Sequence, residues 1–416
     1  MSLDLALKFD HEDSLKNFRQ EFVFPEVKDP KGPLYFAGHS LGLMPKKAST
    51  YINDELKAWG KFGVEGHFEG DHPWLPYHEN ITSSFANLVG ANDVEVVAMN
   101  TLTVNLHLLM VSFYRPTQTR YKILIENNTF PSDKYAVDSQ SRFHGFDPKD
   151  AIVELKPRPG EMHVREADLL QQIKDLGESL SLVLMGNCNY LSGQNFDFQK
   201  ITQAAHQVGA YAGFNLAHGA GNLFLELNKW NVDFAVWCSY KYLNSGPGGI
   251  AGAFVHERHH TSKLHRFEGW WGQNKNTRFK MGPDFDAIPT VEAWQLSNPP
   301  IFQLASLRAS MELFDKATMK KLRSKGDQLT SYFENLIRSE LEGLAEVVTP
   351  ELPQRGSMLC LRFKTSPKTW IHNLREQGVF VDFREPDIIR ATPVPMYNSF
   401  EDVYRLVMKL QQVVKL

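Results

Sequence analysis

The 416-residue sequence has few cysteines, no excess of one charge and no long apolar run. Its cysteines, Cys188, Cys238 and Cys360, are widely spaced and lie in apolar stretches. This spacing excludes a disulfide framework and a cysteine-rich metal site, and no other pattern in the chain indicates a metal ligand set. We therefore expect buried free thiols in a reducing compartment and a protein without a bound metal.

The charge balance and the hydropathy of the chain indicate what kind of partner it binds. Lys and Arg number 45 against 48 Asp and Glu, which gives a net charge of -3. Such a balance indicates neither nucleic-acid binding nor attraction to an anionic membrane. The amino terminus, MSLDLALKFDHED, carries acidic residues where a signal peptide needs a basic region, and no run reaches membrane-spanning length. We expect a soluble cytoplasmic protein with a small-molecule partner.

Short apolar runs alternate with amphipathic stretches, which is typical of a mostly parallel sheet covered by helices. Between two of these runs, DFQKITQAAHQVG predicts a helix that Asp197 caps and Gly209 ends. The predicted strands of this part are 121–126, 180–187, 210–215, 232–238 and 249–255. The sequence therefore predicts an α/β fold with βαβ units.

The hydrophobic pattern of the sequence changes after LSNPP at 296–300. Long helical patterns follow, then predicted strands at 357–363 and 379–384 and a last helix that Ser399 opens. We predict three parts: a large domain over 61–300, a smaller α+β domain over 301–416, and an N-terminal segment, 1–60, that joins the small domain and the active site.

Lys241 directly follows the predicted strand 232–238 and precedes the glycine-rich NSGPGG. In an open α/β sheet, ligands bind at the carboxyl ends of the strands. A surface lysine is the plain alternative. Two further polar clusters, FPSD at 130–133 and NLAH at 215–218, follow other predicted strands and favour a site. A lysine amine there suits a cofactor aldehyde, with which it forms a Schiff base.

If such a cofactor carries a phosphate, the protein needs a separate binding site for that group. Thr103 lies in NTLTVNLHLLMVSF, just where a helical pattern begins. Backbone N–H groups at a helix amino terminus bind anions. An ordinary helix cap explains Thr103 equally well.

Several longer motifs resemble the kynureninase family, enzymes that contain pyridoxal 5'-phosphate and have the aspartate-aminotransferase fold (fold type I). They are HSLGLMPKKA, MNTLTVNLHLLM, FPSDKYA, WCSYKYLN, GGIAGAF, TRFKM, SNPP and PVPMYNSF, and they span nearly the whole chain in the family's order. The resemblance implies a large domain with a mostly parallel sheet, a small carboxyl-terminal domain, and a homodimer whose active site lies at the subunit interface.

The resemblance also implies roles for individual residues. Lys241 bonds to the cofactor, Tyr240 donates a proton, and Arg390 grips the substrate's α-carboxylate. Trp270 and Asn298 reach the site from the partner subunit. The implied cofactor contacts are Leu102, Thr103, Phe130, Pro131, Ser132, Asp133, Gly186, Asn215, His218, Tyr240, Lys241, Trp270 and Asn298, and the implied substrate contacts are Ser40, His67, Ser297, Asn298 and Arg390.

The implied reaction is hydrolytic Cβ–Cγ cleavage of kynurenine or 3-hydroxykynurenine to alanine and an anthranilate. His67, Ser297 and Asn298 resemble the pocket of members that prefer the 3-hydroxylated substrate. Alternatives remain in which the chain catalyses another pyridoxal-phosphate reaction, such as transamination, or binds the cofactor without turnover.

The chain departs from the family at two positions. Asn215 stands where the family has an aspartate beside the cofactor's ring nitrogen, and Gly186 replaces a serine. A neutral amide cannot hold a ring proton by charge. We expect Asp133 to supply the missing charge and Asn215→Asp to raise kcat.

Overall fold

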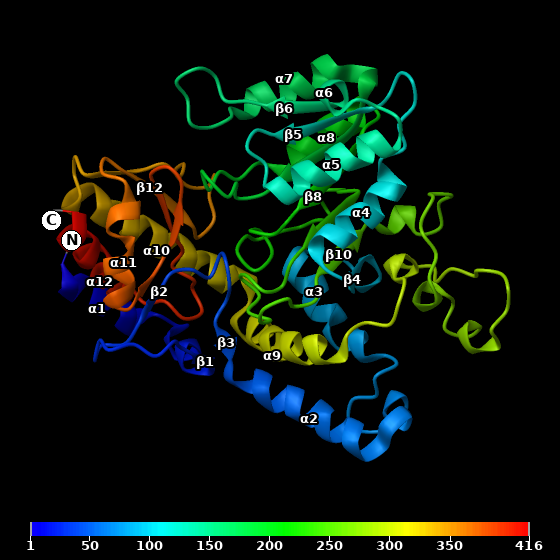
Figure 1. Cartoon of the computed structure of the whole chain (residues 1–416), viewed down its shortest axis with the longest axis horizontal. Coiled ribbons are helices and arrows are strands. Elements are labelled where there is room, and N and C mark those ends of the chain that lie inside the picture. Colours follow the sequence, from blue (N-terminus) through cyan, green and yellow to red (C-terminus); the bar gives the residue numbers. More distant parts are fainter. Residues whose placement is uncertain (1, 415–416) are drawn as a thin grey trace.

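The computed structural model describes residues 2–414, which form an α/β fold built on one large and one smaller sheet (Figure 1). Its helices are α1 (Leu3–Glu12), α2 (Lys46–Phe62), α3 (Thr82–Val89), α4 (Leu102–Phe113), α5 (Pro131–Phe143), α6 (Pro148–Ala151), α7 (Glu166–Leu176), α8 (Phe198–Gln207), α9 (Ile301–Ala317), α10 (Met319–Glu340), α11 (Ile371–Glu376) and α12 (Phe400–Val414). Within the described residues, no helix combines the length and the apolar character that crossing a membrane requires.

The strands are β1 (Phe22–Val23), β2 (Leu34–Tyr35), β3 (Met44–Pro45), β4 (Val96–Ala98), β5 (Lys122–Glu126), β6 (Ile152–Leu155), β7 (Leu180–Gly186), β8 (Tyr211–Asn215), β9 (Phe234–Trp237), β10 (Gly252–Val255), β11 (Ala345–Val347), β12 (Leu359–Phe363), β13 (Val379–Phe380), β14 (Asp382–Arg384) and β15 (Ile388–Ala391).

The large sheet has seven strands in the order β4-β10-β9-β8-β7-β5-β6. The block from β9 to β6 is parallel, whereas β10 runs antiparallel to both β9 and β4. The five predicted strands of this part and the mostly parallel arrangement are confirmed. Sequence patterns missed β4 and β6, which are only three and four residues long.

Helix α8 connects β7 to β8 as predicted. The Asp197 side chain accepts the N–H of Lys200, and Ile201 and Ala205 are buried in the core. Gly209 has φ +76°, a conformation in which a Cβ atom is strained. The cap and the glycine therefore set the two ends of this crossover.

The smaller sheet has the order β11-β12-β15-β14 and packs against α10 and α12. The single strand predicted over 379–384 is wrong. Val381 interrupts it, so that β13 pairs with β2 while β14 joins the smaller sheet. The stretch 379–384 thus contributes one strand to each of two sheets.

Two large groups of buried side chains divide the chain near the middle of α10. Leu304 and Phe314 of α9, together with Leu322, pack with the large sheet, whereas Leu329 and Phe333 pack with the smaller one. The N-terminal segment contributes to both groups. The domain boundary near residue 300 remains a prediction, and packing changes about 25 residues beyond it.

The N-terminal segment also reaches the end of the large sheet. Gly42 N donates to the carbonyl of Tyr240 at 2.8 Å. A side chain at 42 would collide with Asn244 and with the backbone of Lys241. This close approach requires glycine and holds residues 37–42 against the turn that carries Lys241.

Candidate active site

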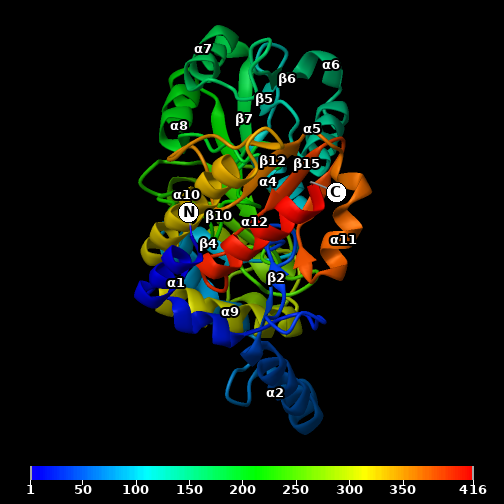
Figure 2. The ribbon, with the colours of Figure 1, turned by 90° about the vertical axis from the view of Figure 1, so that its left-hand side faces the viewer.

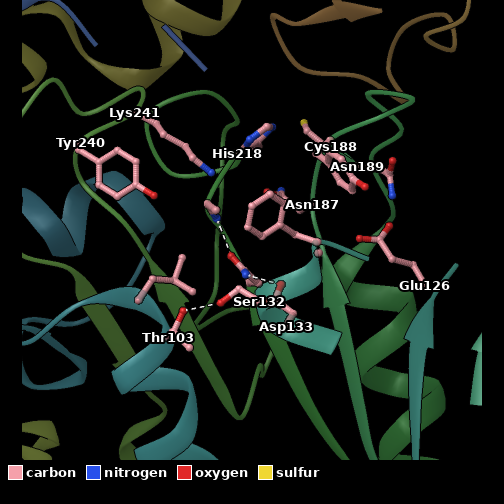
Figure 3. A pocket seen from close by; sticks show the side chains of 16 residues that line it. Thr103, Glu126, Ser132, Asp133, Asn187, Cys188, Asn189, His218, Tyr240 and Lys241 are labelled. Atoms are coloured by element: carbon pink, nitrogen blue, oxygen red, sulfur yellow. Dashed lines mark hydrogen bonds between the residues drawn. The ribbon is translucent and has the colours of Figure 1, made fainter. Parts of the chain in front are cut away.

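The carboxyl ends of four neighbouring parallel strands meet at one pocket of about 170 Å³. Glu126 ends β5, Gly186 ends β7, Asn215 ends β8, and Lys241 follows β9. The predicted site residues that line the pocket are Leu102, Thr103, Phe130, Ser132, Asp133, Gly186, Asn215, His218, Tyr240 and Lys241. Figure 3 shows Thr103 and Tyr240 at one end of the pocket and Glu126 at the other.

Lys241 is not a surface lysine. Its amine lies 5.8 Å from the ring centroid of Phe130 and 5.9 Å from that of Tyr240. Burial lowers the pKa of Lys241, the buried Cys238 thiol raises it, and the Arg390 charge lowers it further. A lysine with a lowered pKa is more readily deprotonated, and only the neutral amine is a nucleophile or a base.

Two helices begin at the pocket. Leu102 and Thr103 open α4, Ser132 and Asp133 lie in the first turn of α5, and the two hydroxyls form a 2.7 Å hydrogen bond. The first N–H groups of each helix have no partner within the helix. Two helix amino termini and two hydroxyls at one place fit a phosphate group.

Asp133 and Asn215 are in direct contact. Asn215 Nδ2 donates to Asp133 Oδ2 at 2.6 Å, and Asn215 Oδ1 accepts the N–H of Ala217 at 2.9 Å. Burial raises the pKa of Asp133 to about 6, which the Asn215 hydrogen bond and the Lys241 charge partly oppose. Asp133 Oδ1 is buried and has no hydrogen-bond partner among residues 2–414. This oxygen can accept a hydrogen bond from a protonated ring nitrogen.

Two buried histidines lie close together, His218 of the large domain, which lines the pocket, and His39 of the N-terminal segment, which does not. Their ring centroids are 6.2 Å apart. Burial lowers the pKa of His39 to about 4 and that of His218 well below its usual value. Both imidazoles are therefore neutral at physiological pH, and His218 Nδ1 finds no partner in the described part of the chain.

Arg390 lies beside the pocket without lining it. Its Nη1 donates to the carbonyl of Tyr190 at 3.0 Å, and Tyr190 lines the pocket. Its Nη2 pairs with Asp382, which also accepts from Arg384 at 3.1 Å. Since β14 and β15 place Asp382 directly opposite Arg390, the sheet register fixes the guanidinium. Its predicted role, binding the substrate's carboxylate, suits a planar guanidinium and stays a prediction.

The other predicted residues lie outside the pocket in a single chain. Pro131 is the first residue of α5, and Ser40 is exposed while its neighbour His39 points inward. His67 stacks edge-on against Trp74. Ser297 and Asn298 are exposed, and Trp270 is 46% exposed.

Several lining residues were not predicted from sequence. They are Glu126, Asn187, Cys188, Asn189, Tyr190 and Ala217. Glu126 lies at the end of an apolar strand and Asn187 directly after one, as the predicted residues do. Their position at strand ends is the one sequence signal that could have identified them. A glutamate that ends a strand does not suggest burial, which is why Glu126 was missed.

Comparison with known proteins decides the family. A kynureninase of Myxococcus xanthus is 57% identical over 412 residues, which cover 99% of this chain and 97% of that protein. The chain belongs to the kynureninase family. Kynureninases of Koribacter versatilis and Nematostella vectensis are 50% and 45% identical, covering 98% and 100% of this chain and 96% and 94% of theirs. The family model of the kynureninase C-terminal domain matches residues 322–410.

Solved structures confirm the fold. A complex of a cystine C–S lyase with cysteine persulfide has a TM-score of 0.77 at 16% identity, covering 92% of this chain and 98% of that one. A cysteine desulfurase of Escherichia coli also has a TM-score of 0.77 at 16% identity, covering 96% and 98%. At this identity, the likeness establishes the fold type I architecture and nothing about the reaction.

Proposed function

We propose that this member of the kynureninase family hydrolyses the Cβ–Cγ bond of kynurenine or 3-hydroxykynurenine with pyridoxal 5'-phosphate. The observation that carries the proposal is the half-buried Lys241, whose pKa is lowered, in a pocket at which two helix amino termini lie. Three free, buried cysteines support a reducing, cytoplasmic location.

The residues present fit the cofactor. The first turns of α4 and α5, with Thr103 and Ser132, would hold the phosphate. The unpartnered Asp133 Oδ1 would hold the ring nitrogen, and Phe130, 48% exposed, offers a free aromatic face toward the pocket. When bound, pyridoxal phosphate supplies an aldehyde that reacts with amines and a ring that accepts electrons.

The side chains divide the remaining work. The Lys241 amine, with its lowered pKa, can take a proton from the substrate's Cα. Burial raises the pKa of Tyr240, so its hydroxyl keeps a proton to donate. Arg390 is positioned to bind the α-carboxylate through its planar fork. Neutral His218 adds no second positive charge beside Lys241.

The direct test is release of anthranilate from kynurenine by the purified protein with pyridoxal phosphate, followed by fluorescence, with alanine quantified in parallel. Equal amounts of the two products are expected. Transfer of the amino group to pyruvate without anthranilate would indicate a transaminase instead. Cofactor binding with no product of either kind would indicate a relative without turnover.

We further propose a homodimer that completes the site. Large aromatic side chains on α2, just after it, on α9 and on the 267–281 segment are exposed: Trp59 58%, Phe68 58%, Phe279 54%, Trp270 46% and Phe302 37%. Trp59 contacts Phe302, and Phe279 contacts both Phe68 and Trp270. Figure 2 shows α2 projecting away from the body of the chain. Clustered exposed aromatics are typical of a protein interface.

The dimer also gives a role to the predicted residues outside the pocket. Trp270 and Asn298 belong to adjacent segments, because Trp271 N donates to the carbonyl of Leu296 at 3.2 Å. His67 precedes Phe68, which contacts Phe279 beside Trp270. All of them lie on the exposed aromatic region, where they would serve the partner's pocket.

Mixed dimers test this arrangement. Neither Lys241→Ala nor Asn298→Ala protomers should be fully active alone. After equal mixing, half of the dimers are hybrids, and each hybrid has one site with both native residues. Activity should therefore reach about a quarter of the wild-type value, plus a quarter of the activity that Asn298→Ala shows alone. Mixing that only averages the two separate activities would show that Asn298 serves its own chain.

A further inference from the structure

Glu126 is a buried acid that the proposed chemistry does not use. Its side chain ends β5 and is 5% exposed. It accepts hydrogen bonds from the Asn189 side chain and the backbone N–H of Gly186, and the Asp133 charge acts on it. No salt bridge to it is found within residues 2–414. Keeping a carboxyl buried without a cation is costly, and such groups cluster at functional sites.

Gly186 makes room for this carboxyl. A Cβ atom at residue 186 would lie 2.5 Å from Glu126 Oε1, too close for any real contact. The absence of a side chain at Gly186, one of the two departures from the family, is therefore coupled to the position of Glu126. The carboxyl occupies the space that a larger residue would fill.

Glu126 and Asn189 also separate two cavities. Both residues line the site pocket and a second cavity of about 200 Å³ between the large domain and the β14–β15 region. The exposed residues Asn128, Met162 and Glu385 line this second cavity, which therefore opens to the surface. It is large enough for several water molecules. Glu126 thus has a route to solvent that does not pass through the site pocket.

We propose that Glu126 is a second acid of the site, which exchanges its proton with solvent through this cavity and so sets the charge that Asp133 faces. It acts through Asp133 and is a positioning residue. When the Glu126 O–H bond breaks, the proton passes to water in the second cavity and one negative charge stays beside Asp133. The proposal rests on the proposed cofactor site.

The surroundings give the direction of the effect. Burial raises the pKa of Glu126 to about 7, the Asn189 and Gly186 donors oppose this, and the Asp133 charge adds to it. The other charged or titratable groups that line the same two cavities are Cys188, Tyr190, His218, Tyr240 and Lys241 in the site pocket, and Arg362, Glu385 and Asp387 in the second cavity. When both groups have lost their protons, two negative charges line the same pocket, and the Asp133 charge makes Glu126 ionise less readily than it would alone.

The experiment titrates the absorbance of the bound cofactor between about pH 5 and pH 9, where carboxyls of raised pKa change charge. Wild type should show a step near pH 7, which Glu126→Gln abolishes. Gly186→Ala, which pushes the carboxyl aside, should move the midpoint. A step that is unchanged in Glu126→Gln overturns the proposal.

A second measurement does not need the cofactor. Infrared difference spectra of the cofactor-free protein between acidic and alkaline pH should show the C=O band of a protonated carboxyl that Glu126→Gln lacks. Identical bands in both proteins would refute the assignment of the proton to Glu126. Failure of kynurenine cleavage alone would refute the proposed reaction and leave both titrations intact.

Discussion

Asp133→Asn removes the carboxylate that, among residues 2–414, has a buried oxygen free to face the cofactor's ring nitrogen. The substitution preserves shape, and the new amide can still accept from Asn215 Nδ2 through its oxygen. Activity should nevertheless collapse, because a neutral amide cannot stabilise a protonated ring by charge.

The expected decrease in kcat can be worked out from the charge interaction that is lost. Two unit charges 4 Å apart interact by about 4 kcal/mol at an effective dielectric of about 20. Losing half of this in the transition state lowers kcat by a factor of about 30, and losing all of it lowers kcat by about a thousandfold. We therefore expect a decrease of between about 30-fold and 1,000-fold.

The same substitution should stabilise the cofactor-free protein. A folded-state pKa of about 6, against an ordinary value of 3.8, means that the folded chain holds the Asp133 proton more tightly than the unfolded chain. Stability is therefore lost as pH rises from about 4 to about 6, by up to about 3 kcal/mol. Asp133→Asn should raise Tm at pH 8, and the gain should vanish near pH 4.

Asp138→Asn on the same helix is the matched control. Asp138 pairs with Lys134 at 2.6 Å near the surface, and such pairs contribute about 1 kcal/mol or less. It should change neither kcat nor the pH dependence of Tm. The assays are anthranilate release and thermal unfolding at both pH values. An Asp133→Asn enzyme with more than about a tenth of wild-type kcat would refute the reasoning.

Asn215→Asp now has a different expected outcome from the one that the sequence suggested. With a donor–acceptor distance of 2.6 Å, a second carboxylate would lie against Asp133, and the pair would share one proton. The two carboxyl groups beside the ring would then together carry a single negative charge, as Asp133 does in the wild type. We expect kcat to change by less than about threefold, with the acidic limb of the pH profile moving, whereas a tenfold gain would show that both carboxylates ionise.

Four further substitutions test the site. Lys241→Ala should lower kcat by more than about a hundredfold while circular dichroism remains native, because general-base catalysis alone contributes two to four decades; substantial turnover would remove Lys241 from the chemistry. Arg390→Lys should raise KM by about tenfold or more with a smaller effect on kcat, since an ammonium loses the two-pronged contact that Asp382 orients; an unchanged KM would place the substrate carboxylate elsewhere. His67→Ala and Asn298→Ala should each reduce the preference in kcat/KM for 3-hydroxykynurenine over kynurenine, because unpaired polar groups discriminate against a missing hydroxyl; equal preference in both variants and the wild type would exclude these residues from reading the ring.

The sequence determined five of the seven strands of the large sheet and the edge at which the site lies. Apolar runs ending in Gly186, Asn215 and the turn of Lys241 are local signals, because every strand of a parallel sheet presents its carboxyl end on the same side. The helix amino terminus at Thr103 was likewise predicted from the helical pattern of residues 100–113, whereas the helix that begins before Ser132 was not predicted. These features need only short-range periodicity.

Tertiary structure alone decided which side chains meet. The Asp133–Asn215 hydrogen bond joins residues 82 positions apart, and no local pattern reports such a distance. The burial of Glu126 depends on the missing side chain at Gly186 and on a loop that brings Asn189 alongside. The division of residues 379–384 between two sheets depends on which partner strands lie nearby. Local propensity fixes the elements, whereas packing between distant segments fixes charge, contact and pKa.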